Sequence, residues 1–410
     1  MFQRLLFALC VLPVLAACEV DRPQSQACVA FPTAEAGTLS TQGAAPPRAR
    51  PDGLAATDAM MARTEADLEA AIRAQVAQAP AVTRTPQRKT VTLNVITLSA
   101  GGQYGAFGAG FLRGWTGNGR PAQFDLVTGV SAGATLAPVA FAGPAFDPLL
   151  DYYDGLGADG IFVRRPTLAI LGAPSIADPR PLRRFLRTAL SPALLRAIAN
   201  GHGQNRRLLI AATNIDNGAG QVFDLGQAAD KARANTCLTE AILASAAIPA
   251  LFPPRHINGA LYADGGIRQH VFLQTLDEAR QQIEATDNVD IKVNAYLIVN
   301  GALLPPLTQA EDSILGYAGR SVELLADEVL RDSIAEAVRF AEGRTDWTLR
   351  GVRAELPADT CAKELAETPN IGGFNACLTR ALFAHGKAQA TQSPIPWLSA
   401  ADLRELAEAL

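Results

Sequence analysis

A serine lies between two glycines where a predicted strand gives way to a predicted helix. The residues are Gly129, Ser131 and Gly133, and they follow an apolar run that ends at Val127. A Gly-x-Ser-x-Gly turn between a strand and a helix is sharp enough to lift the serine hydroxyl clear of the backbone. The feature therefore requires a strand followed by a helix, and it makes Ser131 a candidate nucleophile.

Strand and helix patterns alternate along the middle of the chain. An apolar run over residues 91–98 predicts a buried strand, and a glycine-rich turn separates it from a helical pattern over 106–115. This alternation predicts an α/β fold with a mostly parallel sheet. Further strands are expected at 124–128, 207–213, 221–225 and 292–299, and a further helix at 132–142.

The predicted core domain covers residues 89–302, and a mainly helical region, 303–410, follows it and is expected to cover the sheet. A helical pattern over 57–78 is predicted to pack on the core domain rather than to form a stalk. Residues 18–55 are rich in Pro, Ala and Gly, a composition typical of a flexible tether. Residues 56–88 are thus a helical lead-in between the tether and the core.

Residues 1–17 have the pattern of a secretory signal peptide. A positive charge precedes the apolar residues 5–15, and small residues precede Cys18. The four residues 15–18, Leu-Ala-Ala-Cys, resemble a bacterial lipobox, which implies a lipidated Cys18; an ordinary signal peptide with a chance cysteine is the alternative. Glu19 is not the aspartate of the usual inner-membrane retention signal, so we expect an outer-membrane lipoprotein whose domain faces the periplasm or the outside.

Export would place the remaining cysteines in an oxidising compartment, where disulfides persist. Cys361 and Cys377 flank a loop-like stretch and are the favoured pair, although four cysteines, with Cys28 and Cys237, allow three pairings. No Cys-x-x-Cys spacing occurs and the four histidines are scattered, so no metal site and no cofactor is expected. The net charge of −4, with no basic block, gives no electrostatic support for a nucleic-acid partner, and no protein partner is identifiable.

A second glycine-rich turn follows the strand predicted at 91–98. Its glycines, Gly101, Gly102 and Gly105, lead into a helix, so their backbone N–H groups are expected to face a common point that suits an anion. If that anion is transient, the turn is an oxyanion hole. The glycine spacing matches neither a Walker phosphate loop nor a dinucleotide-binding fingerprint.

Asp264 stands before Gly265 and Gly266 at the end of a short apolar run. An aspartate on such a tight loop can present its carboxylate, although an Asp-Gly turn is common without any function. A fourth piece lies at 244–254, Ala-Ser-Ala-Ala-Ile-Pro-Ala-Leu-Phe-Pro-Pro. Together the four pieces resemble the patatin-like phospholipase family in kind and in order, over about residues 93–275.

The resemblance implies a three-layer α/β/α fold and a Ser–Asp dyad without histidine, formed by Ser131 and Asp264. It also implies hydrolysis of acyl esters of membrane lipids without a metal. The residues themselves agree with this chemistry, since Ser131 needs a base within hydrogen-bonding distance and a dry pocket would strengthen Asp264 as that base. The N–H groups of Gly101, Gly102 and Gly105 would stabilise the oxyanion.

The glycine-rich turn departs from the family pattern at two positions. Ala100 stands where the family usually has glycine, and Tyr104 stands where it has arginine or lysine. An alanine is tolerable at position 100 if its φ is negative. The absence of a positive charge at position 104 puts a preference for anionic head groups in doubt.

Two other functions fit the sequence. A Ser-Asp-His triad of the α/β-hydrolase type would use His270, only six residues past Asp264, or His385 at the end of a helical segment. A non-catalytic lipoprotein that binds lipid is the second alternative, and the Tyr104 departure is its only support. The apolar segment 168–174 is interpreted as core, with an acyl-chain pocket or a lid as the alternative.

Overall fold

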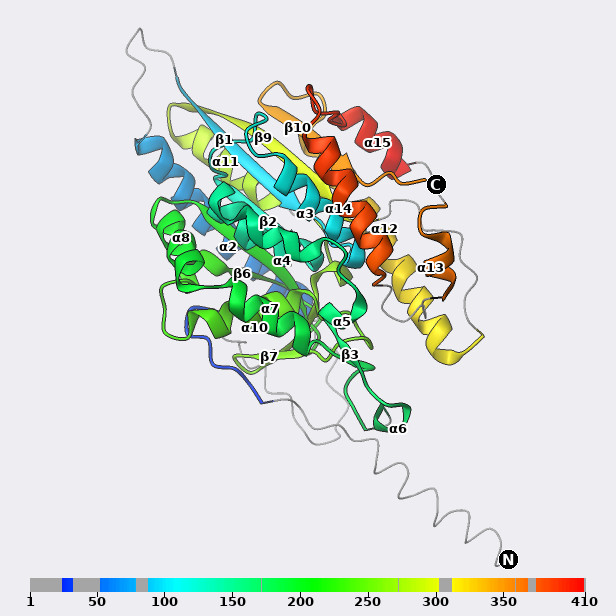
Figure 1. Cartoon of the computed structure of the whole chain (residues 1–410). Coiled ribbons are helices and arrows are strands. Elements are labelled where there is room, and N and C mark those ends of the chain that lie inside the picture. Colours follow the sequence, from blue (N-terminus) through cyan, green and yellow to red (C-terminus); the bar gives the residue numbers. More distant parts are fainter. Residues whose placement is uncertain are drawn as a thin grey trace, which may run out of the picture.

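The structure is a computed structural model, and it describes most of the chain between residues 24 and 408 (Figure 1). The predicted signal peptide, 1–17, and Cys18 lie outside the described residues, as does most of the predicted tether. The described ranges are 24–31, 52–78, 88–170, 172–271, 273–301, 312–357, 359–367 and 374–408.

A central sheet forms the middle layer, with strands in the order β10-β9-β1-β2-β5-β8-β7 and with β6 beside β5. The first five strands in that order are parallel, whereas β6, β7 and β8 run antiparallel to their neighbours. The prediction of a mostly parallel α/β sheet is therefore confirmed. The strands are β1 (Lys89–Leu98), β2 (Leu126–Val130), β5 (Arg207–Asn214), β6 (Gly220–Asp224), β7 (Arg255–Ile257), β8 (Ala260–Asp264), β9 (Val289–Val299) and β10 (Trp347–Arg353).

The remaining elements are helices, 3-10 segments and one small hairpin. The hairpin pairs β3 (Val163–Arg164) with β4 (Ala177–Asp178), and the 3-10 segments are η1 (Gly102–Tyr104), η2 (Pro144–Tyr153) and η3 (Gly265–Ile267). The helices are α2 (Asp52–Gln78), α3 (Gly105–Gly114), α4 (Ala132–Ala142), α5 (Ala158–Ile161), α6 (Thr167–Ile170), α7 (Arg180–Ala189), α8 (Pro192–Gly203), α9 (Leu225–Ala228), α10 (Ala234–Ser245), α11 (Gln274–Thr286), α12 (Ile314–Ala341), α13 (Ala362–Glu367), α14 (Ala376–Ala390) and α15 (Ala400–Glu408).

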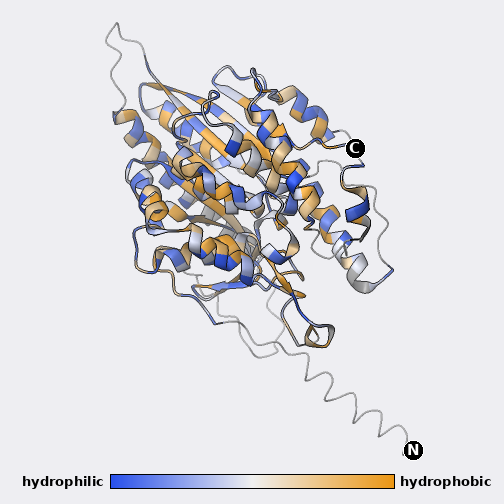
Figure 2. Ribbon diagram, in the orientation of Figure 1, coloured by the Kyte–Doolittle hydropathy of each residue, from blue (hydrophilic) through white to orange (hydrophobic). Residues whose placement is uncertain are grey.

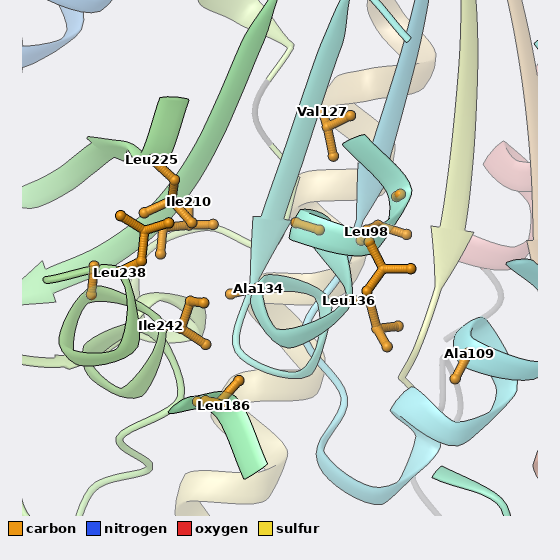
Figure 3. Packing of buried hydrophobic residues seen from close by; sticks show 14 of the residues in the cluster. Leu98, Ala109, Val127, Ala134, Leu136, Leu186, Ile210, Leu225, Leu238 and Ile242 are labelled. Atoms are coloured by element: carbon orange, nitrogen blue, oxygen red, sulfur yellow. The ribbon is translucent and has the colours of Figure 1, made fainter. Parts of the chain in front are cut away.

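Helices cover both faces of the sheet, which gives the expected three layers. Side chains alternate between the two faces of a strand, so Ile96 and Leu98 of β1 enter one core while Leu93 and Val95 enter the other. The first core lies under α3, α4, α7, α8, α10 and α14, and Figure 3 shows part of it. The second lies under α2, α11, α12 and α15. In Figure 2 the strands are largely in the hydrophobic colour, whereas hydrophilic residues are frequent on the outer helices.

The sheet continues past the domain boundary predicted at residue 302. β10 pairs in parallel with β9, from Trp347 opposite Val293 to Arg353 opposite Val299, and forms one edge of the sheet. In addition, α14 packs on α3. The region 303–410 is thus mainly helical, as expected, but it also supplies a strand whose seven residues carry too short a pattern to be recognised in the sequence.

Residues 24–31 lie against the domain, although the sequence places them in a flexible tether. A disulfide joins Cys28 to Cys237 on α10, so this part of the tether prediction is wrong. The covalent link is between residues far apart in the sequence, and composition carries no information about it. A second disulfide joins Cys361 to Cys377 and confirms the pair that the sequence favours.

The predicted lead-in helix is α2, and it packs on the domain rather than forming a stalk. Leu68, Ala71 and Ile72 are buried, and Arg73 forms an ion pair with Asp287. None of the helices in the described ranges is both long and apolar enough to cross a bilayer.

Candidate active site

Ser131 occupies a strained turn between β2 and α4. β2 ends at Val130, two residues later than predicted, and α4 begins at Ala132. Between them Ser131 has φ 51° and ψ −115°, a conformation that residues with a side chain rarely adopt. Such strain persists only where the surrounding structure enforces it, and it concentrates at functional sites. The strand-to-helix turn expected from the sequence is therefore present, with the serine at its apex.

The glycines of the turn are needed because the backbone passes too close to neighbouring chains for a side chain. A Cβ on Gly133 would lie 2.0 Å from the carbonyl oxygen of Leu98, at the end of β1. A Cβ on Gly129 would lie 2.7 Å from the carbonyl oxygen of Gly133. Gly265 faces the same constraint, with the carbonyl oxygen of Ala211 at 2.3 Å. These glycines allow α4 and the Asp264 loop to lie directly against the ends of the parallel strands.

Asp264 ends β8 and directs its carboxylate at Ser131. Its Oδ2 accepts a hydrogen bond from the Ser131 hydroxyl at 2.7 Å, and its Oδ1 accepts one from the Gly266 backbone N–H at 2.8 Å. Asp264 is only 6% exposed and Ser131 only 4%. The structure thus brings together, away from bulk water, two residues that the sequence selects from positions 133 residues apart.

The environment of Asp264 changes its acidity. Burial raises the pKa of this carboxyl from its ordinary value of 3.8 to about 6, and hydrogen bonds from Ser131 and Gly266 oppose the rise. Burial has this effect because it disfavours the charged form. A carboxyl with a pKa near 6 is a stronger base than a free aspartate and is still mostly ionised at neutral pH, which suits proton transfer.

The end of α10 holds the backbones of both residues. Ser245 Oγ accepts a hydrogen bond from the Ser131 backbone N–H at 3.0 Å and donates one to the carbonyl oxygen of Ala211 at 2.6 Å. Two residues further on, the carbonyl oxygen of Ala247 accepts the Asp264 backbone N–H at 3.0 Å. Sequence reasoning assigns no role to Ser245, although its place in the fourth motif is a signal that could have found it.

The glycine-rich turn after β1 presents free N–H groups. Among the described residues, the backbone N–H groups of Gly101 and Gly102 have no hydrogen-bond partner. Asn300, directly after β9, fixes the start of this turn: its backbone N–H donates to Ser99 Oγ at 2.8 Å, and its side-chain amide donates to the Ser99 carbonyl oxygen at 2.9 Å. Asn300 is missed by sequence reasoning, although a polar residue directly after a parallel strand is a signal for it.

Gly105 does not fit the oxyanion role expected of it. Its backbone N–H donates to the carbonyl oxygens of Gln103 and Gly102 within the 3-10 turn, so it is not free to bind an oxyanion. Gly105 is instead required by packing, because a Cβ there would lie 2.8 Å from the Cβ of Ala132. Gly101 and Gly102 therefore remain the candidate donors.

The two departures from the family pattern have different consequences. Ala100 is not among the residues with positive φ, so alanine adds no backbone strain there. Tyr104 is partly buried, and burial together with the negative charges of Glu323 and Asp327 on α12 raises the pKa of its hydroxyl. The charges that act on this position are therefore negative, opposite in sign to the lysine or arginine of the family pattern.

Neither histidine of the triad alternative forms a hydrogen bond to Ser131 or Asp264 in the described structure. His270 Nε2 bonds to the carbonyl oxygen of Gly266 at 3.1 Å, and burial lowers the pKa of this ring to about 4, so it is neutral. His385 lies on α14, where its ring packs against an aromatic ring of α3, with 5.9 Å between the centroids. The serine and the aspartate are bonded directly, and no histidine stands between them.

One close group of metal-ligand side chains occurs in the described ranges, namely Cys361, Glu364 and Cys377. The two cysteines are joined in a disulfide. Because the thiolate is the form that binds a metal ion, this group lacks the sulfur ligands that a site would need.

A comparison with family models adds to this geometry. Residues 96–277 match the model described as patatin-like phospholipase. These residues form a patatin-like phospholipase domain. With this domain the protein is a lipid acyl hydrolase. The patatin-like range contains the glycine-rich turn, Ser131 and Asp264, whereas β9, β10 and the helices after α11 lie beyond it.

Among solved structures, this patatin-like protein is similar to the crystal structure of VipD from Legionella pneumophila. The sequence identity is 12% and the TM-score is 0.31, with 75% of this chain and 67% of that chain covered. A similarity of this strength carries no argument about function. No curated protein matches the chain.

Proposed function

We propose that this protein hydrolyses acyl esters of membrane lipids with Ser131 as the nucleophile and Asp264 as the general base. The observation that carries the proposal is the 2.7 Å hydrogen bond from the Ser131 hydroxyl to Asp264 Oδ2. A serine is a weak nucleophile until a base within hydrogen-bonding distance takes its proton. With its pKa raised to about 6, Asp264 is ionised at neutral pH and is able to take that proton.

In the first half-reaction, Ser131 Oγ attacks the ester carbonyl carbon while its proton moves to Asp264 Oδ2. The carbonyl oxygen becomes an oxyanion, which the N–H groups of Gly101 and Gly102 stabilise. As the tetrahedral intermediate collapses to an acyl-serine, Asp264 gives the proton to the leaving alcohol oxygen. Water then attacks the acyl carbon and loses a proton to Asp264. That proton returns to Ser131 Oγ as the fatty acid leaves, and the enzyme is restored.

We also propose that Cys18 carries lipid and anchors the protein in the bacterial outer membrane. The residues before Cys18 resemble a lipobox. The disulfides Cys28–Cys237 and Cys361–Cys377 support export, because disulfides persist in oxidising compartments. Metabolic labelling with an alkyne fatty acid is expected to mark the parent chain in the membrane fraction and to leave Cys18→Ser unmarked. Equal labelling of the two proteins would overturn the anchor.

Hydrolysis of a short-chain nitrophenyl ester and of a phospholipid panel tests the proposed chemistry. The chain from residue 19 is suitable, since it retains every described residue. We expect the parent to turn over the ester and a fluorophosphonate to label Ser131, whereas Ser131→Ala should show only the background rate. His385→Ala is expected to keep the parental rate, and its inactivity would indicate a triad. A folded parent with neither turnover nor labelling would indicate a lipid-binding protein instead.

The activity is expected to fall below a pH of about 6, because only the ionised form of Asp264 accepts the serine proton. Since the pKa of this carboxyl is raised to about 6, kcat/KM on the uncharged nitrophenyl ester should decrease about tenfold for each pH unit below that value. Above it, the profile should be level until the ester hydrolyses spontaneously. A profile that stays flat down to a pH of about 4.5 would contradict the assignment of Asp264 as the base.

Ser245→Ala is expected to slow both ester hydrolysis and fluorophosphonate labelling of Ser131 by about 10–100-fold. The substitution leaves the buried Ser131 N–H without an acceptor, which costs about 1–3 kcal/mol, and a shift of the strained turn would relieve that cost. Ser175→Ala is the matched control, since it also removes a buried hydroxyl that donates to a backbone carbonyl, that of Ala177 at 2.7 Å. Equal labelling rates in the two variants would show that Ser245 does not position the serine.

A further inference from the structure

The hairpin β3–β4 and the short helix α6 between its strands project from the domain, and this projection carries exposed apolar side chains. β3 and β4 pair antiparallel, and Figure 1 shows α6 at the outer end of this hairpin, away from the sheet. Leu168 on α6 is 86% exposed, Val163 on β3 is 46% exposed, and Ala169 is also exposed. The interpretation of 168–174 as core is therefore wrong at Leu168. This short helix presents a large apolar side chain to the surroundings of the protein.

The base of the projection is hydrogen-bonded to the segment that follows α10. The backbone N–H groups of Ile176 and Ala177 donate to the carbonyl oxygens of Ala250 and Leu251, each at 2.9 Å. The same segment, three residues earlier, holds the backbone of Asp264. The projection is thus attached to the same short segment, residues 247–251, that holds the backbone of Asp264.

The next helix, α7, has one face of arginines. Arg180, Arg184 and Arg187 are spaced so that they share one side of a helix, and all three are exposed. On the other side, Leu182 and Leu186 are buried in the core. Within the described ranges, no carboxylate lies within 4 Å of Arg184 or Arg187, while Arg180 pairs with the nearby Asp178.

Positive charge is concentrated in this part of an acidic chain. Residues 163–190 contain six arginines and one acidic residue, Asp178, so their net charge is +5, whereas the whole chain has a net charge of −4. The sequence contains no longer basic run here than the pairs Arg164–Arg165 and Arg183–Arg184, and uncharged residues separate these pairs from the other arginines. The arginine face begins at Arg180, two residues after β4, and Arg180 pairs with Asp178 of that strand, so it starts at the base of the projection that carries Leu168. Basic and exposed apolar side chains are together typical of surfaces that bind anionic lipids.

We propose that this basic–apolar face, formed by Leu168 and Ala169 of α6 and by Arg180, Arg184 and Arg187 of α7, docks on the surface of an anionic lipid bilayer. The inference deepens the proposed lipid hydrolase and rests on it. The arginines bind lipid phosphates and the α6 side chains enter the apolar layer beneath them. The hydrolase site is then held next to its substrate.

The segment that follows the proposed anchor is linked by a disulfide to α10, the helix that packs on α7. Residue 24, the first that the structure describes, is six residues past Cys18, and six extended residues span at most about 20 Å. The disulfide of Cys28 fixes this segment to α10. On α10, the side-chain amide of Asn235 donates to the carbonyl oxygen of Arg187 at 2.9 Å. An acyl chain on Cys18 would therefore hold α7 close to the membrane, and in Figure 1 residues 24–31, α7 and α6 lie toward one end of the molecule.

Vesicle co-sedimentation tests the proposal with the chain from residue 19 that carries Ser131→Ala, which leaves the lipids intact. Binding to vesicles of phosphatidylglycerol and phosphatidylcholine should exceed binding to phosphatidylcholine alone by about tenfold or more, and added salt should weaken it. Arg184→Gln with Arg187→Gln is expected to weaken binding to the anionic vesicles by about 30-fold, from about 1 kcal/mol per basic side chain. Leu168→Gln is expected to weaken it by about tenfold.

The matched control is Arg63→Gln with Lys292→Gln, which removes the same charge from exposed positions on α2 and β9. We expect this control to bind anionic vesicles as tightly as the parent does. If it lost as much affinity as the α7 double variant, net charge alone would explain the effect, and the docking face would be overturned. Two other results would overturn the proposal. One is that the parent binds no vesicles, and the other is that the parent self-associates and that Leu168→Gln abolishes this self-association. In proteins that keep Ser131, every one of these variants should hydrolyse the short-chain ester at the parental rate. Failure of the parent in that assay would remove the proposed function, whereas failure in the vesicle assay alone would remove only the docking face.

Discussion

Asp264→Asn is expected to lower kcat by about 10²–10⁴-fold, which is the usual contribution of a general base. Asparagine keeps the shape of the side chain, and its oxygen can still accept the Gly266 backbone N–H that Asp264 Oδ1 accepts at 2.8 Å. Its amide cannot take up the proton of Ser131. Steady-state kinetics on the short-chain ester at about pH 8, well above the raised pKa of Asp264, measure the loss.

This loss should come without a loss of stability. The folded pKa of Asp264, about 6, exceeds its ordinary value of 3.8, so the native state binds this proton more tightly than the unfolded chain does. The contribution of the group to the free energy of unfolding therefore falls as the pH rises between these two values. Above them, the buried charge costs on the order of 3 kcal/mol, and asparagine avoids that cost.

Asp264→Asn should consequently melt at no lower a temperature than the parent at about pH 8, as measured by calorimetry. A variant that melts like the parent and keeps more than a tenth of the parental kcat would exclude Asp264 as the base. Ser131→Ala, which removes the nucleophile and leaves the carboxylate, is the companion variant for the background rate.

Gly101→Ala is expected to lower kcat by at least about 10²–10³-fold, the usual cost of losing one oxyanion donor. A Cβ at this position would lie 1.5 Å from the carbonyl oxygen of Asn300 and 2.1 Å from its carbonyl carbon. Because the clash is with backbone, no side chain can rotate away to relieve it. The turn must move, and its N–H groups then leave the place where the oxyanion forms. Steady-state kinetics, with the melting temperature measured alongside, give the size of the effect.

Gly102→Ala is the matched control for this substitution. No atom lies within 4 Å of a Cβ at Gly102, and its φ of 53° is one that alanine adopts at a cost of roughly 1–2 kcal/mol. The backbone N–H is kept, so kcat is expected to change by less than about tenfold. If Gly101→Ala were as active as Gly102→Ala, the turn after β1 would have no part in stabilising the oxyanion.

The chemistry of the site can be predicted from the sequence where it depends on neighbouring residues. Gly129 and Gly133 mark the sharp turn around Ser131 because only glycine allows so close an approach of backbone. The same reasoning fails for Gly105, whose N–H is used inside a 3-10 turn that glycine spacing does not specify. It also fails for Leu168, since an apolar stretch has the same sequence pattern whether it lies in a core or on an exposed projection.

Contacts between distant segments are beyond such reasoning. Ser245 reaches the Ser131 backbone, and Asn300 reaches the turn after β1, because the strand order of the sheet departs from the order of the sequence. The link from Cys28 to Cys237 joins positions 209 residues apart. No local sequence pattern predicts these long-range contacts.

By itself the sequence determined the fold class, the turn at Ser131 and the choice of Asp264 as the carboxylate to pair with Ser131, because periodicity and glycine placement are local properties of the chain. Only the tertiary structure decided that the two side chains meet at 2.7 Å and that burial raises the pKa of the carboxyl. It also decided that Arg180, Arg184 and Arg187 of α7 are exposed to solvent. Hydrogen bonding and desolvation depend on which atoms come together in space, and folding alone brings them there.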